Sequence, residues 1–297
     1  MLIGFGYVAT RQGLFSDAGV DGLMRFTQKF AIPCLLFSAM STLDLAAVFN
    51  WRLLVSFYAG ALTCFVLGLL GARHLFGRPW TDAVAIGFCA LFSNSVLLGL
   101  PIAERAYGAA SLASNFAIIA IHSPVCYLTG ITAMEIARNS GKPILSTLRS
   151  ILKAMFSNAL IIGIVLGVAV NLSGIPLPAP LVEAVGMMVR AAIPVALFGL
   201  GGILVRYRPE GDLRTIGVVV ALSLVVHPAI AYGLGTGLGL SQEGLRAAVL
   251  TGAMAPGVNA YVFADMYGNA RRVAASSVLF GTAATVLTAW VWLAVLG

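Results

Sequence analysis

The chain has 297 residues and a mass of 30.9 kDa, a length that a soluble protein would use for one large domain or two. Apolar residues make up 60% and charged residues only 10%, against roughly 45–50% and about 25% in soluble domains. So few charges cannot cover the surface of a soluble protein of this size. The composition therefore argues against a soluble enzyme, a nucleic-acid-binding protein and a disordered regulator, and it predicts an integral membrane protein.

Long runs without charge divide the chain into membrane spans, since a helix needs about 20 mainly apolar residues to cross the hydrocarbon core. Seven runs of at least 18 residues contain no Asp, Glu, Lys or Arg: Leu53–Ala72, Ala83–Ala103, Ala106–Met134, Ala154–Val182, Thr215–Gln242, Ala247–Ala264 and Val273–Gly297. Phe30–Leu43 and Ala191–Val205 become spans when one basic residue near the start of each is admitted. Met1–Thr10 brings the total to ten, although its length of about 15 Å is only half a bilayer. We number these ten segments 1 to 10 in chain order, so that Met1–Thr10 is segment 1. Without period-2 alternation, we expect an all-α fold of ten transmembrane helices, the first one truncated.

The basic residues predict the orientation of these spans. Sorting the 18 Lys and Arg residues by alternating connection places fourteen on one side and only Arg52, Arg105, Arg190 and Arg246 on the other. This positive-inside bias puts the loops after segments 1, 3, 5, 7 and 9 in the cytoplasm and both termini outside. We therefore expect a multi-pass protein of the inner cell membrane, in contact with lipid, with its central loop in the cytoplasm.

The chain also resembles itself. Residues 29–37, which contain Ile-Pro and Leu-Phe, recur as residues 190–198 at an offset of 161, and shorter matches join the ends of segments 4 and 9 and the starts of segments 5 and 10. Five spans per repeat is an odd number, so the second repeat must enter the membrane from the opposite face. We predict two inverted repeats, 1–137 and 154–297, joined by a cytoplasmic linker over 138–153. Such repeats characterise secondary transporters.

Segments 4 and 9 predict the binding site. Segment 4 contains Asn94 and Pro101, segment 9 contains Pro256, Gly257 and Asn259, and in both an amide side chain accompanies Gly and Pro inside a span. Proline removes a backbone donor and interrupts the helix, and irregular backbone at membrane depth is tolerated where it faces protein or a wet cavity. The freed N–H groups suit a carboxylate. The alternative is an ordinary pair of kinks with Asn bonding between helices.

These motifs resemble the auxin efflux carrier family, which includes the plant PIN-type carriers and bacterial relatives. The resemblance rests on Ser-Asn-x-x-x-x-Gly-x-Pro from Ser93 to Pro101, on Pro-x-x-Asn-x-x-x-Phe-Ala from Pro256 to Ala264, and on Pro-x-x-Leu-Phe in segments 2 and 7. It implies a scaffold of segments 1, 2, 6 and 7, and a transport domain of segments 3–5 and 8–10. Helices 4 and 9 cross near their prolines there.

The resemblance also implies a function. Family members carry organic anions such as auxin, malonate or malate, and the asparagines beside the substrate carboxylate match Asn94 and Asn259 of this chain. We therefore expect an elevator-type secondary carrier for a small organic anion. Ser95 and Gly257 join the expected binding site, with Pro101 and Pro256 as helix-breaking positions at the crossing. The resemblance suggests a homodimer, and no cofactor, metal or nucleic-acid partner is expected.

Three further residues at membrane depth have competing interpretations. Arg190 lies inside segment 7, where its guanidinium either binds or gates the substrate or reaches the outer interface. His122 in segment 5 is a candidate for proton coupling, although a neutral histidine bonded to a helix carbonyl is the commoner outcome. His227 precedes Pro228 and is the weaker candidate. The coupling ion, proton or sodium, stays open.

Two other readings compete with an organic-anion carrier. A sodium-coupled carrier of the bile-acid or arsenite type would be favoured by carboxylates near the crossing, which the sequence does not place there. An intramembrane enzyme would need a His/Glu metal set or an activated nucleophile at depth, and a sensor would be favoured by a soluble domain. The sequence names neither the substrate nor the direction of transport.

Overall fold

The computed structural model describes residues 1–44, 50–138, 149, 159–206 and 212–297. Throughout this part of the chain the regular elements are helices, which confirms an all-α membrane protein. Five helical stretches are long and apolar enough to cross a membrane: Trp51–His74, Ala113–Ala137, Ala179–Arg206, Leu213–Gly237 and Arg271–Leu296. The remaining predicted spans are shorter or interrupted helices.

The chain divides into two compact units, and each unit takes a piece from both halves of the sequence. Unit 1 comprises Met1–Val48 and Ala154–Tyr207, and unit 2 comprises Phe49–Lys153 and Arg208–Gly297. Unit 1 thus holds the predicted segments 1, 2, 6 and 7, and unit 2 holds segments 3–5 and 8–10. This is the division that the family resemblance implies. The predicted linker 138–153 lies outside the described residues, apart from Arg138 and Arg149.

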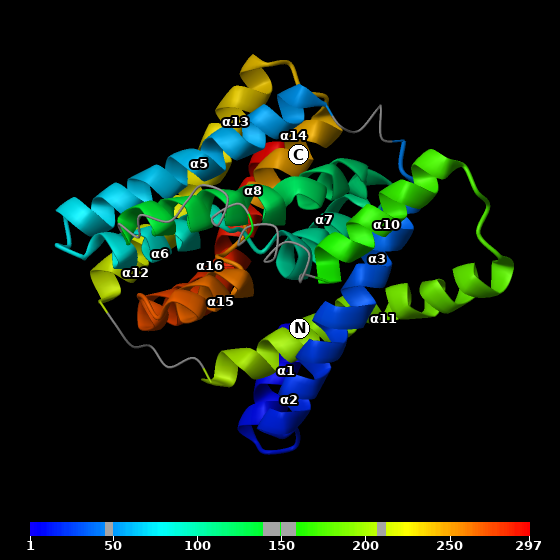
Figure 1. The fold of residues 1–297 in the computed structure, drawn as a ribbon, viewed down its shortest axis with the longest axis horizontal. Coiled ribbons are helices and arrows are strands. Elements are labelled where there is room, and N and C mark those ends of the chain that lie inside the picture. The colour runs from blue at the N-terminus through cyan, green and yellow to red at the C-terminus, as the bar shows by residue number, and fades with distance from the viewer. Residues whose placement is uncertain (45–49, 139–148, 150–158, 207–211) are drawn as a thin grey trace. The chain divides into compact units, whose positions relative to one another are not determined.

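Unit 1 is built of paired helices (Figure 1). Its helices are α1 (Leu2–Arg11), α2 (Asp17–Phe26), α3 (Ile32–Thr42), α10 (Ala159–Ser173) and α11 (Ala179–Arg206). α1 packs along α11, and α3 packs along α10. The predicted short first segment is therefore a helix of 10 residues that lies against the 28-residue α11.

Glycines let these helices approach backbone to backbone. A methyl group at Gly6 of α1 would lie 2.0 Å from the carbonyl oxygen of Phe198, and one at Gly201 of α11 would lie 2.0 Å from that of Ile3. Gly163 of α10 meets the backbone of α3 in the same way. Such small residues are typical of helix interfaces in membranes, where close packing replaces the hydrophobic effect as the driving force.

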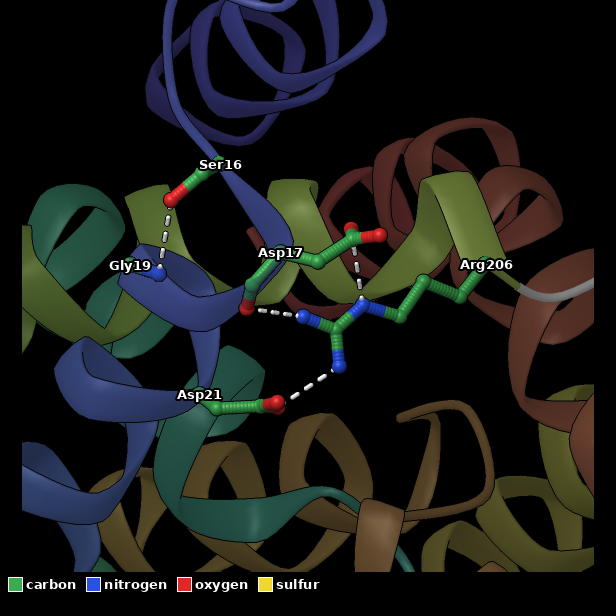
Figure 2. Close-up of polar contacts among 5 residues, drawn as sticks. All are labelled: Ser16, Asp17, Gly19, Asp21 and Arg206. Carbon is green, nitrogen blue, oxygen red and sulfur yellow. Dashed lines mark hydrogen bonds and ion pairs between the residues drawn. The ribbon is translucent and has the colours of Figure 1, made fainter.

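An arginine ties the end of α11 to the start of α2 (Figure 2). Arg206 Nε lies 3.2 Å from Asp17 Oδ1, one terminal nitrogen donates to Asp21 Oδ1 at 2.6 Å, and the other donates to the Asp17 carbonyl. Ser16 caps α2 by accepting a hydrogen bond from the Gly19 N–H at 3.1 Å. Asp17 and Arg206 stand at helix ends whose partial charges favour them.

We expect Arg206→Gln to lower the melting temperature of the purified protein only slightly, and less so in high salt. The arginine side chain is 31% exposed, and ion pairs of this kind contribute about 1 kcal/mol or less. Thermal unfolding in detergent at low and high salt measures the effect. Arg25→Gln, at an exposed position of α2, is the matched control, because it removes one positive charge from the same unit. A shift at Arg206 no larger than at Arg25 would show that the ion pairs do not stabilise unit 1.

Three π-helical turns among the described residues each end two positions before a proline. The turns are η1 (Thr27–Ala31), η2 (Ser95–Gly99) and η4 (Leu222–Val226), and the second residue of the helix that follows each is Pro33, Pro101 or Pro228. In η2, for example, the Leu100 N–H reaches back five residues to the Ser95 carbonyl. A proline ring clashes with the carbonyl four residues earlier, and the wider turn relieves that clash.

Unit 2 holds the interrupted helices (Figure 1). Its helices are α5 (Trp51–His74), α6 (Trp80–Leu91), α7 (Leu100–Tyr107), the short 3-10 turn η3 (Ala109–Leu112), α8 (Ala113–Ala137), α12 (Leu213–Ala221), α13 (His227–Gly237), α14 (Gln242–Gly252), α15 (Val258–Tyr267) and α16 (Arg271–Leu296). α5 packs along α6, α13 and α14, while α16 packs on α12 and α15. Predicted segment 4 is therefore α6, η2 and α7, and segment 9 is α14 and α15.

Candidate functional site

The two interrupted segments of unit 2 cross and pair with each other. The backbone N–H of Asn94 donates to the carbonyl of Ala255 at 2.8 Å, and the N–H of Gly257 donates to the carbonyl of Phe92 at 2.8 Å. These two bonds form an isolated antiparallel bridge between Ser93 and Pro256. We call residues 92–94 and 255–257 the break segments. Each supplies backbone partners that the other lost when its helix stopped.

Close approach at the crossing depends on glycine. A methyl group at Gly257 would lie 3.2 Å from Cδ1 of Phe92 and 3.4 Å from the carbonyl oxygen of Ser93. One at Gly281, on α16, would lie 2.8 Å from Cδ of Pro256. Pro256, in the middle of the bridge, has no N–H that would need a partner there.

Asn94 has one half of its amide committed and the other half free. The residue is 4% exposed, and its Oδ1 accepts a hydrogen bond from the Leu97 N–H at 3.3 Å as the N-cap of η2. Its Nδ2 is buried and has no partner among the described residues. A buried donor left unsatisfied costs about 1–3 kcal/mol. A buried donor of this kind, at a break in a membrane helix, is suited to an acceptor on a ligand.

The other predicted binding residues lie at the helix starts of the crossing. Asn259 is half-buried in the first turn of α15, and Gly257, its N-cap, offers no side-chain oxygen to the first N–H groups of that helix. Ser95 is 3% exposed and begins η2. Uncapped N–H groups at a helix start carry partial positive charge and favour an anion.

Two predicted residues lie elsewhere. Pro101 lies in α7, but the helix of predicted segment 4 is interrupted earlier, at Phe92–Asn94. The structure therefore places the interruption upstream of this proline. The wider turn η2 relieves the clash between the Pro101 ring and the preceding backbone, so the helix need not end at the proline. It ends at Phe92–Asn94 because the backbone there is hydrogen-bonded to Ala255 and Gly257. Arg190 belongs to α11 of unit 1, where its side chain is exposed.

The two histidines of predicted spans differ in their partners. His122 of α8 is 2% exposed, and its Nε2 lies 3.5 Å from Ser93 Oγ. His227 begins α13, is 1% exposed, and has Nε2 3.1 Å from the Phe57 carbonyl. A carbonyl can only accept, so His227 carries its proton on Nε2.

Sequence reasoning missed several buried polar groups of α8 and α16. Asn115 Nδ2 donates to Thr251 Oγ1 of α14 at 2.9 Å. On α16, the hydroxyls of Ser277 and Thr282 are buried and have no partner within the described part of the chain. Asn115 and Ser277 stand at matching places of the internal repeat, at the start of segments 5 and 10, and that match was the available signal. Across the same residues no group of three or more His, Cys, Asp or Glu side chains could hold a metal ion.

Comparisons with known proteins place the chain in a family. The family model described as "Membrane transport protein" matches residues 1–293. A "Putative malonate transporter" of Rhizobium meliloti (strain 1021) is 27% identical over 293 residues, covering 97% of this chain and 90% of that protein. An "Uncharacterized transporter" of Methanothermobacter thermautotrophicus is 24% identical over 277 residues, covering 89% of this chain and 85% of that protein.

A shorter match reaches a eukaryotic protein. A "Lysosomal cholesterol signaling protein" of Mus musculus is 31% identical over 105 residues, which is 34% of this chain and 12% of that protein. The names of the family and of the Rhizobium relative describe transporters rather than enzymes. Because the family model covers nearly the whole sequence, the chain belongs to the membrane transport protein family, the auxin efflux carrier family that its motifs indicated.

Proposed function

We propose that the chain is a secondary carrier for a small organic anion, of the size and charge of malonate, bound at the crossing of unit 2. The observation that carries this proposal is the buried, unpartnered Nδ2 of Asn94 beside two break segments. The name of the Rhizobium relative supports the choice of malonate.

The chemistry of the crossing suits a carboxylate. Asn94 Nδ2 would donate to one carboxylate oxygen, and the N–H groups that begin α15, with the Asn259 amide, would serve others. Ser95 and Gly257 shape the two helix starts. All of these donors are neutral, so the site itself places no charge inside the membrane. We assign Arg190, with its planar fork of donors, to attracting the anion from the outer side.

The two compact units supply the parts of an elevator mechanism. In this proposal unit 2 is the transport domain that carries the anion, and unit 1 is the scaffold, each built from both inverted repeats of a ten-helix chain. The distribution of basic residues supports an inner-membrane location with both termini outside and the loop over 138–153 in the cytoplasm. We further propose that the carrier works as a homodimer.

Uptake of labelled malonate into proteoliposomes tests the function. We expect uptake by the wild-type protein and a loss of at least about tenfold for Asn259→Ala, because hydrogen bonds to a charged group contribute about 1.5–3 kcal/mol. Asn269→Ala is the matched control, since the Asn269 amide bonds Thr81 and Asp82 away from the crossing. Equal uptake by the wild type and Asn259→Ala would overturn the site assignment. Malonate uptake by wild-type proteoliposomes no greater than by protein-free liposomes would overturn the choice of substrate.

A further inference from the structure

A titratable side chain, His122, contacts one of the two break segments. His122 is buried in α8, and its Nε2 lies 3.5 Å from the hydroxyl of Ser93, at the outer limit of a hydrogen bond. Ser93 is itself 3% exposed, pairs with Pro256 in the bridge, and directly precedes Asn94. Any change of charge at His122 therefore acts on the break segment that holds the proposed anion site.

The groups that face His122 are nearly all uncharged. Aromatic rings surround it, with ring centroids 4.7 Å away for Phe92 and 5.6 Å for Phe57. Its titratable neighbours are Tyr58 from α5, Cys126 from α8 itself and His227 from α13, and Tyr127 of α8 packs on the same Phe92 ring. The Tyr58 proton is committed to the Ile118 carbonyl at 2.8 Å. η2 and η3 contain no charged residue. The charged residues of α6 and α14 lie in the first half of each helix: Asp82, whose Oδ1 accepts from Asn269, and Glu243 and Arg246, of which Arg246 donates to the Gly297 carbonyl.

The partners of His122 tolerate both protonation states. The Ser93 hydroxyl and the Cys126 thiol, whose sulfur lies 3.7 Å from Nδ1, can each donate or accept a hydrogen bond. A neutral Nε2 accepts from Ser93, and a protonated Nε2 donates to the same oxygen, so the ring gains or loses a proton without stranding a partner. In a transport cycle the proton would come from the water on one side of the membrane and be released to the water on the other side.

His227 is the contrasting case, although it is equally buried. Its Nε2 is held by the Phe57 carbonyl at 3.1 Å, and its ring fills the space above Gly60 and Gly252, where added methyl groups would lie 2.7 Å and 3.2 Å from its Cδ2. The hydrogen bond fixes one tautomer and the two glycines fix the ring. We assign His227 to packing.

Charge links His122 to the anion. A buried imidazolium without a counter-ion is costly, and an anion at Asn94 would supply the missing negative charge one residue from Ser93. The converse also holds, because each ligand must raise the affinity for the other by the same factor. From this geometry we propose that His122 binds the coupling proton, so that the carrier takes up a proton together with the anion. This inference rests on the proposed function and names its coupling ion.

Binding of malonate to the purified protein between about pH 6 and pH 8, the range around histidine titration, tests the inference. We expect the affinity of the wild type to rise as the pH falls, by up to tenfold per pH unit. His122→Gln should bind with one affinity across the range, equal to that of the wild type at the alkaline end. His227→Gln is the matched control and should keep the pH dependence. Thermal unfolding shows whether each variant is folded.

A second measurement needs no variant. Titration of malonate into wild-type protein in buffers of different ionisation enthalpy counts the protons taken up, and we expect up to one per anion beyond those bound by malonate itself. Wild-type binding without pH dependence or proton uptake would overturn the coupling alone. Retention of the pH dependence by His122→Gln would overturn the assignment to this residue. Failure of the wild type to bind malonate at any pH would overturn the proposed function, and the coupling with it.

Discussion

Asn94→Ser is expected to reduce malonate affinity by roughly 10–150-fold while leaving the melting temperature of the protein nearly unchanged. The reduction corresponds to the loss of one hydrogen bond to a charged group, about 1.5–3 kcal/mol. Stability should be kept because serine is about as good an N-cap as asparagine, so the bond that Oδ1 accepts from the Leu97 N–H has a replacement. Equilibrium binding and thermal unfolding of the same preparations measure the two effects.

Two further variants separate the cap from the ligand. Asn94→Ala removes both the cap and the free donor, so it should lower affinity as Asn94→Ser does and also cost about 1 kcal/mol of stability. Asn50→Ser changes another asparagine N-cap of unit 2, which accepts from the Arg52 N–H at 2.9 Å, and should alter neither quantity. If Asn94→Ser binds malonate as tightly as the wild type, the free Nδ2 is not a ligand donor.

Gly6→Ala is expected to destabilise unit 1 by about 1–3 kcal/mol or more, the usual cost of forcing atoms into a packed interior. The added methyl group would lie 2.0 Å from the carbonyl oxygen of Phe198, and backbone cannot rotate away as a side chain can. α1 would have to move off α11. The measurement is the melting temperature in detergent, supported by the yield of monodisperse protein.

The same helix provides the matched control. A methyl group at Gly4 has no atom within 4 Å, so Gly4→Ala gains helix propensity without a clash and should keep or raise the melting temperature. Equal effects of the two substitutions would mean that α1 does not pack on α11 through Gly6.

Hydropathy predicted the long helices closely because it depends on neighbouring residues alone. The run Leu53–Ala72 lies within α5, and Val273–Gly297 overlaps nearly all of α16. The interruptions were harder to place. Pro101 carries a clear local signal, yet the helix stops before Ser95, because hydrogen bonds to residues about 160 positions away decide where it ends.

The same limit applies to individual site residues. The sequence singled out Asn94, but which half of its amide is free depends on the Leu97 N–H and on burial. It ranked His227 below His122 from the neighbouring Pro228 alone, and it could not give their hydrogen-bond partners, Ser93 and Phe57, which come from other parts of the chain. The types of residue at a site can be read locally, whereas their hydrogen-bond states require the fold.

The two backbone hydrogen bonds between the break segments bear on how tightly so small an anion can be held. They fix both segments before any ligand arrives, so little conformational entropy remains to be lost when one binds. A ligand with few atoms gains at best about 1.5 kcal/mol from each non-hydrogen atom. Preorganised break segments remove the cost of ordering the protein from that free energy, and a small, strongly hydrated anion has little free energy to lose.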